Sequence, residues 1–191
     1  MQILKHIIIR ECPGVYPPRE DTFLLIKAIE VTPGERLLEM GCGTGIVSIH
    51  CAVAGAVVTA VDIDKKAIEC TKRNAKCNDV QIDAVHSDLF SSTKGCFDTI
   101  IFNPPYIPAN DDADGSVAWN GGECGTVVLA RFLREAPRFL SEKGRIIVVV
   151  SSLMNENELK KILSDFKVER IAEMHLFFET ISVLQLRPIL H

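Results

Sequence analysis

The chain has 191 residues, 47% of them hydrophobic and 24% charged, which is an ordinary globular composition. This length suits one domain with a sizeable core, so we interpret residues 1–191 as a single domain. A net charge of −4 gives no general attraction to nucleic acid or to an anionic membrane. The sequence also has no apolar run near the roughly 18 residues that a membrane-spanning helix needs.

Seven cysteines are scattered along the chain, without a C-x-x-C pair or a cysteine–histidine cluster at zinc spacing. Several of them, including Cys51, Cys70 and Cys96, lie within predicted elements. This pattern is typical of reduced, mostly buried thiols in a cytoplasmic protein. We expect no metal site.

Strand-like and helix-like segments alternate along the chain. Residues 1–12 are predicted to form a short strand or hairpin arm, and a helix opens at 19–22, where Asp21 or Thr22 would cap its free amides. The predicted helices are 19–30, 46–54, 65–77, 127–140 and 155–165. The predicted strands are 36–40, 56–61, 81–86, 97–102, 145–150, 167–176 and 179–186. The helix 127–140 is expected to stop near 141–144.

This alternation, closed by two strands with no helix between them, predicts the fold. We expect an α/β three-layer sandwich around a Rossmann-like, mostly parallel seven-stranded sheet with an antiparallel closing strand. The β-branched segment 145–150 should be a central strand. The segment 81–86 should lie at a sheet edge, where another chain could pair with it.

A glycine-rich turn joins the first core strand to the next helix. Gly41, Gly43 and Gly45 form a G-x-G-x-G pattern just after Glu39. Glycines let the backbone approach a ligand closely, and the free amides of a helix start favour polar or anionic groups. The third glycine comes one residue earlier than in the dinucleotide fingerprint G-x-G-x-x-G. An acidic residue followed by G-x-G-x-G is the form seen in enzymes that bind S-adenosylmethionine.

Carboxylates follow the ends of two later strands. Asp62, with Ile63 after it, comes about 20 residues after the first glycine, an interval that nucleoside-binding folds use for a ribose contact. We expect Asp62 to bind ribose and Asp64 to cap the next helix, although either could be the cap. Asp88, followed by Leu89, would accept a hydrogen bond from an adenine amino group or would only stabilise its loop.

The sequence Asn103-Pro104-Pro105-Tyr106 follows the apolar strand 97–102 and ends it, because successive prolines cannot continue a ladder or a helix. Asn103 and the Pro104 carbonyl are therefore expected at the carboxyl edge of the sheet, where open α/β folds bind ligands. Together they would offer two acceptors to a planar NH2 group, and Tyr106 would supply a flat face beside them. An ordinary proline turn is the alternative.

The segment 107–126 is polar and contains three aspartates and the only tryptophan. A loop of this length is usually functional or disordered. Its position next to the proline turn favours a lid or substrate-recognition loop, and its acidity suits a basic peptide substrate. A mobile surface loop is the alternative.

These motifs occur in the order seen in one enzyme family. Glu39–Gly45, Asp62, Asp88 and Asn103–Tyr106 together resemble the class I S-adenosylmethionine-dependent methyltransferases, and the last motif resembles their amino-group-methylating branch. The chain is also similar to the short HemK-type subfamily, the release-factor glutamine methyltransferases of eukaryotic and archaeal type. The segments that carry this narrower resemblance are 15–25, 118–122 and 179–184.

The resemblance covers nearly the whole chain and implies roles for the matching residues. Asn103, Pro104 and Tyr106 would act in catalysis. The residues expected to contact S-adenosylmethionine are Thr22, Glu39, Gly41, Gly43, Gly45, Asp62, Ile63, Asp88, Leu89 and Asn103. The implied substrate is the glutamine amide of the Gly-Gly-Gln motif in a class 1 peptide release factor.

The resemblance also bears on partners. Eukaryotic members of the short subfamily depend on a small zinc-binding activator subunit, and we expect such a partner at the edge strand near Gln81–His86. The N-terminal helical domain of the bacterial enzymes is expected to be absent. One departure is that the first core strand ends in Glu39 and Met40, where many relatives have Asp and Leu.

The acceptor pair predicts a mechanism of direct transfer. Asn103 Oδ1 and the Pro104 carbonyl would accept both N–H hydrogens of an amide and orient its nitrogen, with Tyr106 packed against the amide plane. The same acceptors could hold the exocyclic amine of a nucleobase, so a nucleic-acid methyltransferase is the main alternative, although nucleic acid is disfavoured by the net charge. A lysine methyltransferase and a non-catalytic cofactor-binding module are further alternatives.

Overall fold

The computed structural model describes residues 1–4, 6–106 and 126–189, so the predicted recognition loop lies outside the described residues except for Thr126. The strands are β1 (Arg36–Met40), β2 (Val57–Asp62), β3 (Ile82–His86), β4 (Phe97–Phe102), β5 (Leu140–Ser151), β6 (Phe166–His175) and β7 (Thr180–Pro188). The helices are α1 (Glu20–Ala28), α2 (Ile46–Val53), α3 (Lys65–Cys77), α4 (Val127–Glu135), the 3-10 helix η2 (Ala136–Phe139) and α5 (Glu156–Ile162).

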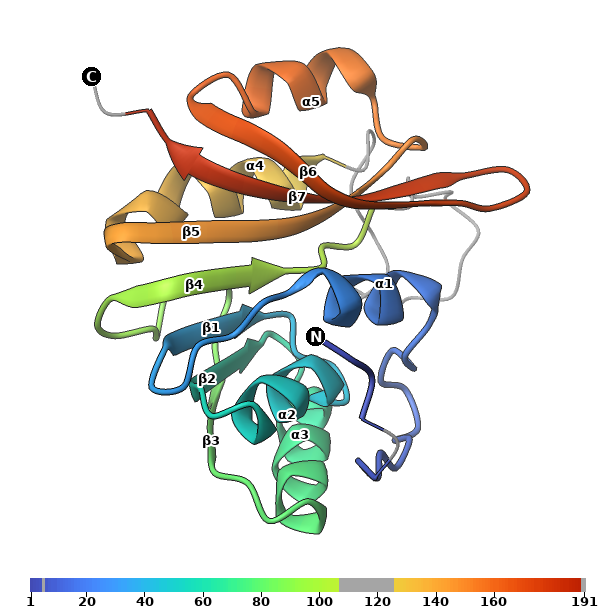
Figure 1. Ribbon diagram of the computed structural model, residues 1–191, viewed down its shortest axis with the longest axis vertical. Helices are drawn as coiled ribbons and strands as arrows, with labels where there is room; N and C mark the ends of the chain where they lie inside the picture. Colours follow the sequence, from blue (N-terminus) through green and yellow to red (C-terminus); the bar gives the residue numbers. More distant parts are fainter. Residues whose placement is uncertain (5, 107–125, 190–191) are drawn as a thin grey trace.

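The strands form one seven-stranded sheet in the order β3-β2-β1-β4-β5-β7-β6 (Figure 1). The pairs from β3 to β5 are parallel, whereas β7 is antiparallel to both of its neighbours. The predicted mostly parallel sheet with an antiparallel closing strand is confirmed. The central place of β5 and the edge place of β3 are confirmed by the same order.

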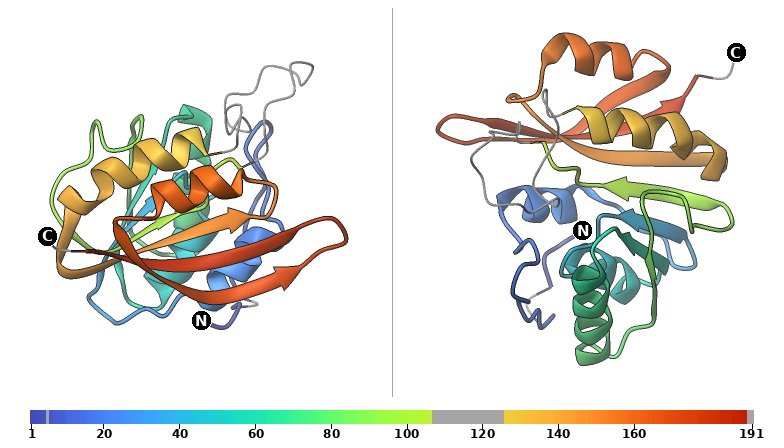
Figure 2. Two further views of the ribbon diagram at one scale, coloured as in Figure 1. Left: turned by 90° about the horizontal axis from the view of Figure 1, so that it is seen from above. Right: turned by 180° about the vertical axis from the view of Figure 1, so that it is seen from behind.

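Alternate residues of the central strands feed two separate cores. Ile100 and Ile146 pack in a cluster with Phe132 of α4, whereas Ile101 and Ile147 pack with residues of α1 and α2 on the opposite face. Helices therefore cover both faces of the sheet, as the two views of Figure 2 show. Strands that are buried on both faces need apolar side chains at successive positions, which explains their continuous hydrophobic runs.

The expected short strand or hairpin arm in residues 1–12 is wrong, because the described residues of this segment include no strand and those from Ile8 onward run against α3. The Ile8 amide donates to Asn78 Oδ1 at 2.8 Å, and the Arg10 amide donates to Asn74 Oδ1 at 3.1 Å. The backbone donors of the segment are thus met by side chains of a helix rather than by a neighbouring strand.

Two predicted boundaries around residue 140 are also wrong. The predicted helix 127–140 ends at Glu135 and continues as η2, since Pro137 has no amide proton for an α-helical hydrogen bond. The strand predicted for 145–150 begins earlier, so residues 141–144 belong to β5, whose first residue, Leu140, pairs with Phe97 across a register shift.

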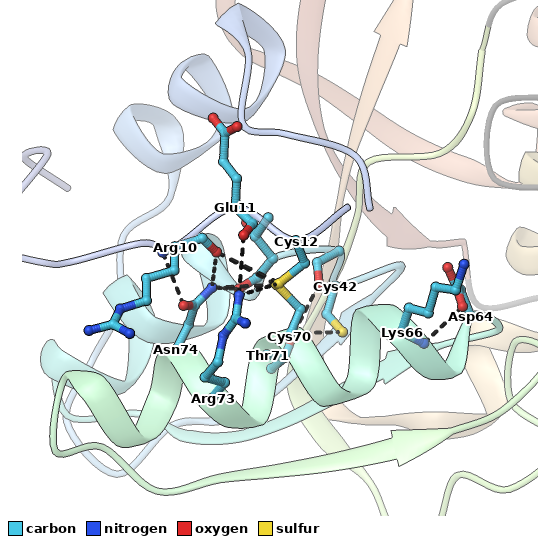
Figure 3. Close-up of a disulfide and its surroundings, with 12 residues drawn as sticks. Arg10, Glu11, Cys12, Cys42, Asp64, Lys66, Cys70, Thr71, Arg73 and Asn74 are labelled. Atoms are coloured by element: carbon cyan, nitrogen blue, oxygen red, sulfur yellow. Dashed lines mark hydrogen bonds between the residues drawn. A yellow bond between two sulfur atoms is a disulfide. The ribbon is translucent and has the colours of Figure 1, made fainter. Parts of the chain in front are cut away.

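The expectation of seven reduced and mostly buried thiols is wrong as well. Cys12 and Cys70 form a disulfide that joins the N-terminal segment to α3 (Figure 3). Arg73 of the same helix donates to the Glu11 carbonyl at 3.2 Å and so holds the same stretch of chain. Of the other cysteines, Cys42 and Cys51 are buried, and the two at positions 77 and 96 are exposed.

Within the described ranges, none of the helices has the length and apolar character needed to span a bilayer.

Candidate active site

A cavity of about 540 Å³ lies at the carboxyl edge of the sheet, where β1, β2 and β4 end. The first turn of α1 and the first turns of α4 supply further parts of its wall. The carboxyl ends of parallel strands meet at one edge, which is where ligands bind in open α/β sheets. Every predicted site residue except Gly45 lines this cavity.

The glycine turn brings bare backbone to the cavity wall. Gly41 and Gly43 have φ angles of 68° and 52°, in the left-handed region that favours glycine. A Cβ added to Gly41 would lie 3.3 Å from the ring of Phe102. Gly45 instead faces α3, where an added Cβ would come within 2.8 Å of Thr71. Gly45 therefore serves the packing of α2 on α3, and its contact with a cofactor stays a prediction.

Two carboxyl groups at the ends of β1 and β2 are held by hydrogen bonds. Glu39 is buried and accepts from both the amide and the hydroxyl of Ser48, and burial raises its pKa to about 8. Asp62 accepts from the amides of Gly43 at 3.0 Å and Asp64 at 2.9 Å, and burial also raises its pKa. The Asp62 carboxyl group is thereby fixed in the cavity wall at the position predicted for a ribose contact.

The wall beyond β3 contains Asp88 and Leu89. Arg131 of α4 donates to Asp88 Oδ2 at 2.9 Å, and both side chains are about half exposed. Leu89 is buried with a φ of 45°, and Ile63 is half exposed. Sequence reasoning did not identify Arg131, because nothing local links it to a carboxylate 43 residues earlier. The adenine contact of Asp88 stays a prediction.

Asn103 has a fixed orientation at the cavity. Its Nδ2 donates to Asp21 Oδ2 at 2.9 Å, which directs the other half of the amide away from Asp21. Asn103 Oδ1 is buried and has no hydrogen-bond partner among the described residues. An unmet buried acceptor costs about 1–3 kcal/mol, so a donor from a bound molecule is expected to satisfy it. Pro104 and Tyr106 line the same cavity.

Asp21 is a buried residue of the cavity wall whose contact with Asn103 the sequence did not predict. It is only 2% exposed, and its Oδ2 accepts from Asn103 and from the hydroxyls of Tyr16 at 3.2 Å and Tyr106 at 3.4 Å. Its Oδ1 accepts the Thr22 amide at 2.7 Å. The sequence suggested a helix cap only, and the capping prediction holds for one amide of the first turn. A role beyond capping would have required knowing that the start of the helix faces the cleft, and only the fold reveals this orientation.

The two tyrosines that contact Asp21 remain protonated donors. Burial, followed by the negative charge of Asp21, raises the pKa of Tyr16 and of Tyr106 above the usual range. Glu179, at the start of β7, adds to the shift at Tyr106. A tyrosine hydroxyl that keeps its proton can donate a hydrogen bond to a carboxylate, so both tyrosines help to hold the Asp21 side chain in place.

Known proteins resemble this chain over most of its length. Residues 6–177 match the model of the methyltransferase small domain family. The chain belongs to this family. This methyltransferase is 41% identical over 179 residues to a Methanocaldococcus jannaschii protein with the provisional name protein N5-glutamine methyltransferase, covering 90% of this chain and 91% of the relative. It is 37% identical to methyltransferase HEMK2 of Mus musculus, covering 78% and 77% of the two chains.

Solved structures share the fold of this methyltransferase. A chain of the E. cuniculi Mtq2–Trm112 complex, described as methylating the eRF1 translation termination factor, superposes with a TM-score of 0.73. The match has 23% sequence identity and covers 92% of this chain and 99% of that chain. The expected class I methyltransferase fold is therefore confirmed.

The cavity of this methyltransferase fits S-adenosylmethionine. The fixed carboxyl group of Asp62 suits ribose hydroxyls, and Gly41 and Gly43 leave bare backbone on the wall where side chains would take up room. Apolar side chains, including Leu89 and Ile63, line the region beside Asp88 where a flat base would pack. The unmet Asn103 Oδ1 lies in the same cavity, so the methyl donor and the acceptor amide would share one enclosure.

Proposed function

We propose that this methyltransferase transfers the methyl group of S-adenosylmethionine to the side-chain amide nitrogen of a protein glutamine, in the Gly-Gly-Gln motif of a class 1 peptide release factor. The observation that carries the proposal is the buried Oδ1 of Asn103, which has no hydrogen-bond partner in the described part of the chain, while the Nδ2 of the same amide is held by Asp21. The name of the relative with 41% identity supports glutamine over a nucleobase or a lysine as the acceptor. The termination factor named for the E. cuniculi complex points to the same class of substrate.

The chemistry of the acceptor explains why this arrangement is needed. S-adenosylmethionine supplies an electrophilic methyl group on a sulfonium. A glutamine amide nitrogen is a weak nucleophile, because its lone pair is delocalised into the carbonyl group. Asn103 Oδ1 and the Pro104 carbonyl would accept its two N–H hydrogens, fix the plane of the amide and stabilise the positive charge that develops on nitrogen. Tyr106 would pack against that plane.

A partner subunit is part of the proposal. β3 lies at the edge of the sheet, so its outer backbone groups are available to a strand from another chain. A small activator subunit, of the zinc-binding type that the resemblance implies, would dock by adding a strand along Ile82–His86. The two-protein composition of the E. cuniculi complex supports such an arrangement. A cytoplasmic location belongs to the same proposal, since release factors act on ribosomes.

Mass spectrometry of the methylated product tests the proposed function. The purified protein would be incubated with S-adenosylmethionine and intact release factor, with and without extract of the source cells to supply an activator. We expect a mass increase of one methyl group, assigned by fragmentation to the glutamine of Gly-Gly-Gln. Parallel reactions with ribosomal RNA and DNA serve as the comparison, and methyl transfer to a nucleobase alone would contradict the proposal.

Replacing Asp21 with asparagine is expected to lower kcat by about 10- to 100-fold, because a hydrogen bond to a charged group contributes about 1.5–3 kcal/mol. The carboxylate accepts from Thr22 with one oxygen and from Asn103 with the other, and the amide replaces one of these oxygens with an NH2 donor that would face another donor. Steady-state kinetics should show the loss in kcat, while calorimetry shows little change in the Kd for S-adenosylhomocysteine.

The matched control for this variant is Glu20→Gln, which removes the neighbouring exposed carboxylate of the same helix turn. It should leave kcat unchanged. Equal losses in cofactor affinity and kcat in Asp21→Asn would mean that Asp21 only supports the cavity wall, and its role as a positioning residue would then be rejected.

A further inference from the structure

The tip of the β6–β7 hairpin exposes two adjacent aromatic side chains. Phe177 is 92% exposed and Phe178 is 85% exposed, and their rings meet edge to face with centroids 4.6 Å apart. Among the described residues, the next most exposed large hydrophobic side chain is Val57 at 64%. Aromatic residues are rarely left in water in this way, and exposed apolar groups of this kind mark interaction sites.

The tip lies beyond the same edge of the sheet as the cavity, namely the edge formed by the carboxyl ends of the parallel strands. β5 runs parallel to β4 and ends at Ser151, which pairs with Ile181. The hairpin continues past this point and closes where the Leu176 amide donates to the Glu179 carbonyl at 2.7 Å. In Figure 1 the hairpin extends beyond the ends of β4 and β5 on the side of α1. The aromatic pair therefore projects beyond the carboxyl edge, where Asn103 follows β4.

The base of the tip is anchored to the sheet beside the site. Glu179 Oε1 accepts the hydroxyl of Ser151 at 2.6 Å, and the Ser152 amide donates to the Thr180 carbonyl at 2.9 Å. Glu179 is also the residue whose charge acts on Tyr106 in the cavity. The exposed rings are thus adjacent in sequence to a residue, Glu179, that connects the end of β5 with the candidate active site.

The size and surroundings of the pair indicate the kind of partner. An aromatic side chain offers about 150–250 Å², so two fall well short of the roughly 1,200 Å² that a stable dimer buries. The part of β6 away from the tip is exposed at Lys167–Arg170, where three of the four residues are charged. The tip itself, Leu176–Glu179, has no lysine or arginine that would bind a phosphate backbone, and its one charged residue is the carboxylate Glu179. A small aromatic anchor suits one contact of a transient protein interface.

We propose that Phe177 and Phe178 are a docking contact for the protein whose glutamine is methylated, and that they pack against apolar side chains on its surface beside the glutamine. This inference rests on the proposed function, because a free amide or a short peptide would reach the cavity without touching the tip. The pair would add affinity for the folded substrate and leave the chemical step unchanged.

The test compares an intact substrate with a short one. In the double variant Phe177→Ser/Phe178→Ser, kcat/KM for intact release factor should fall about 10- to 100-fold, mainly through a higher KM. A short Gly-Gly-Gln peptide from the same factor should show unchanged kcat/KM, and the Kd for S-adenosylhomocysteine should not move. The control is Val168→Ser, an exposed apolar position at the far end of β6, which should behave as wild type.

Direct binding of intact release factor, measured by calorimetry with the wild type and the double variant, separates this inference from the proposed function. If the wild type transfers no methyl group but binds the factor through the two rings, the proposed function fails and the docking contact stands. Equal losses with intact factor and peptide would overturn the docking contact, as would unchanged kinetics and binding. If the double variant lost binding to RNA and kept its binding to release factor, that result would also overturn the docking contact and assign the two rings to base stacking.

Discussion

Replacing Asn103 with alanine is expected to lower kcat by about 10²- to 10³-fold, since removing one preorganised transition-state contact costs roughly 2.7–4 kcal/mol. The alanine variant lacks the buried oxygen that would accept a hydrogen of the substrate amide. It also leaves Asp21 Oδ2 without its Asn103 donor, although the hydroxyls of Tyr16 and Tyr106 still donate to it. Single-turnover kinetics with saturating cofactor would isolate the transfer step.

Binding of S-adenosylhomocysteine to this variant, measured by calorimetry, should match the wild type. The control is Asn155→Ala, which removes a cap of α5 far from the cavity and should lower stability slightly without changing kcat. Wild-type turnover in the Asn103 variant would show that the unmet oxygen does not hold the substrate. Loss of cofactor binding together with turnover would assign Asn103 to the cofactor alone.

Removing the disulfide between Cys12 and Cys70 is expected to lower the free energy of unfolding by about 4 kcal/mol. The two residues are 58 positions apart, and a cross-link of this span restricts the unfolded chain by about that amount in the chain-entropy treatment. Urea unfolding of the wild type should therefore show a lower midpoint with dithiothreitol, whereas Cys12→Ser/Cys70→Ser should be insensitive to the reductant.

Thiol titration provides an independent check on the bond. The chain has seven cysteines, and Cys12 and Cys70 are paired, so reduction of the denatured protein should expose two further thiols and bring the total to seven. Cys77→Ser, which removes an exposed free thiol, is the matched control and should keep the wild-type response to reductant. Seven thiols in the unreduced protein, with a midpoint that ignores reductant, would show that the pair does not form.

The fold could be predicted from the sequence because its strands are buried on both faces. Such strands have continuous apolar runs, which local patterns reveal, and β1 and β4 have the predicted bounds. The failures come where long-range contacts decide the local structure. Residues 140–144 join β5 because Phe97 of another strand pairs with Leu140, and no nearby residue indicates this pairing.

The candidate site could be predicted to the extent that its residues follow strand ends. Parallel strands present their carboxyl ends at one edge, so motifs after β1, β2, β3 and β4 had to converge there. Gly41, Gly43 and the proline turn after β4 could be predicted in this way, because the backbone conformations that they require are set by the local sequence. Gly45 has the same local signature but packs against α3, and a sequence pattern cannot separate these two uses.

By itself the sequence determined the class of fold, the edge of the sheet that binds ligands and the residue types present there. Only the tertiary structure decided which side chains meet across that edge. Asp21 and Asn103 are 82 residues apart, and Cys12 and Cys70 are 58 apart. The physical reason is that a hydrogen bond or a disulfide depends on distances of a few ångströms between segments, and those distances follow from the packing of helices on the sheet rather than from any local preference of the chain.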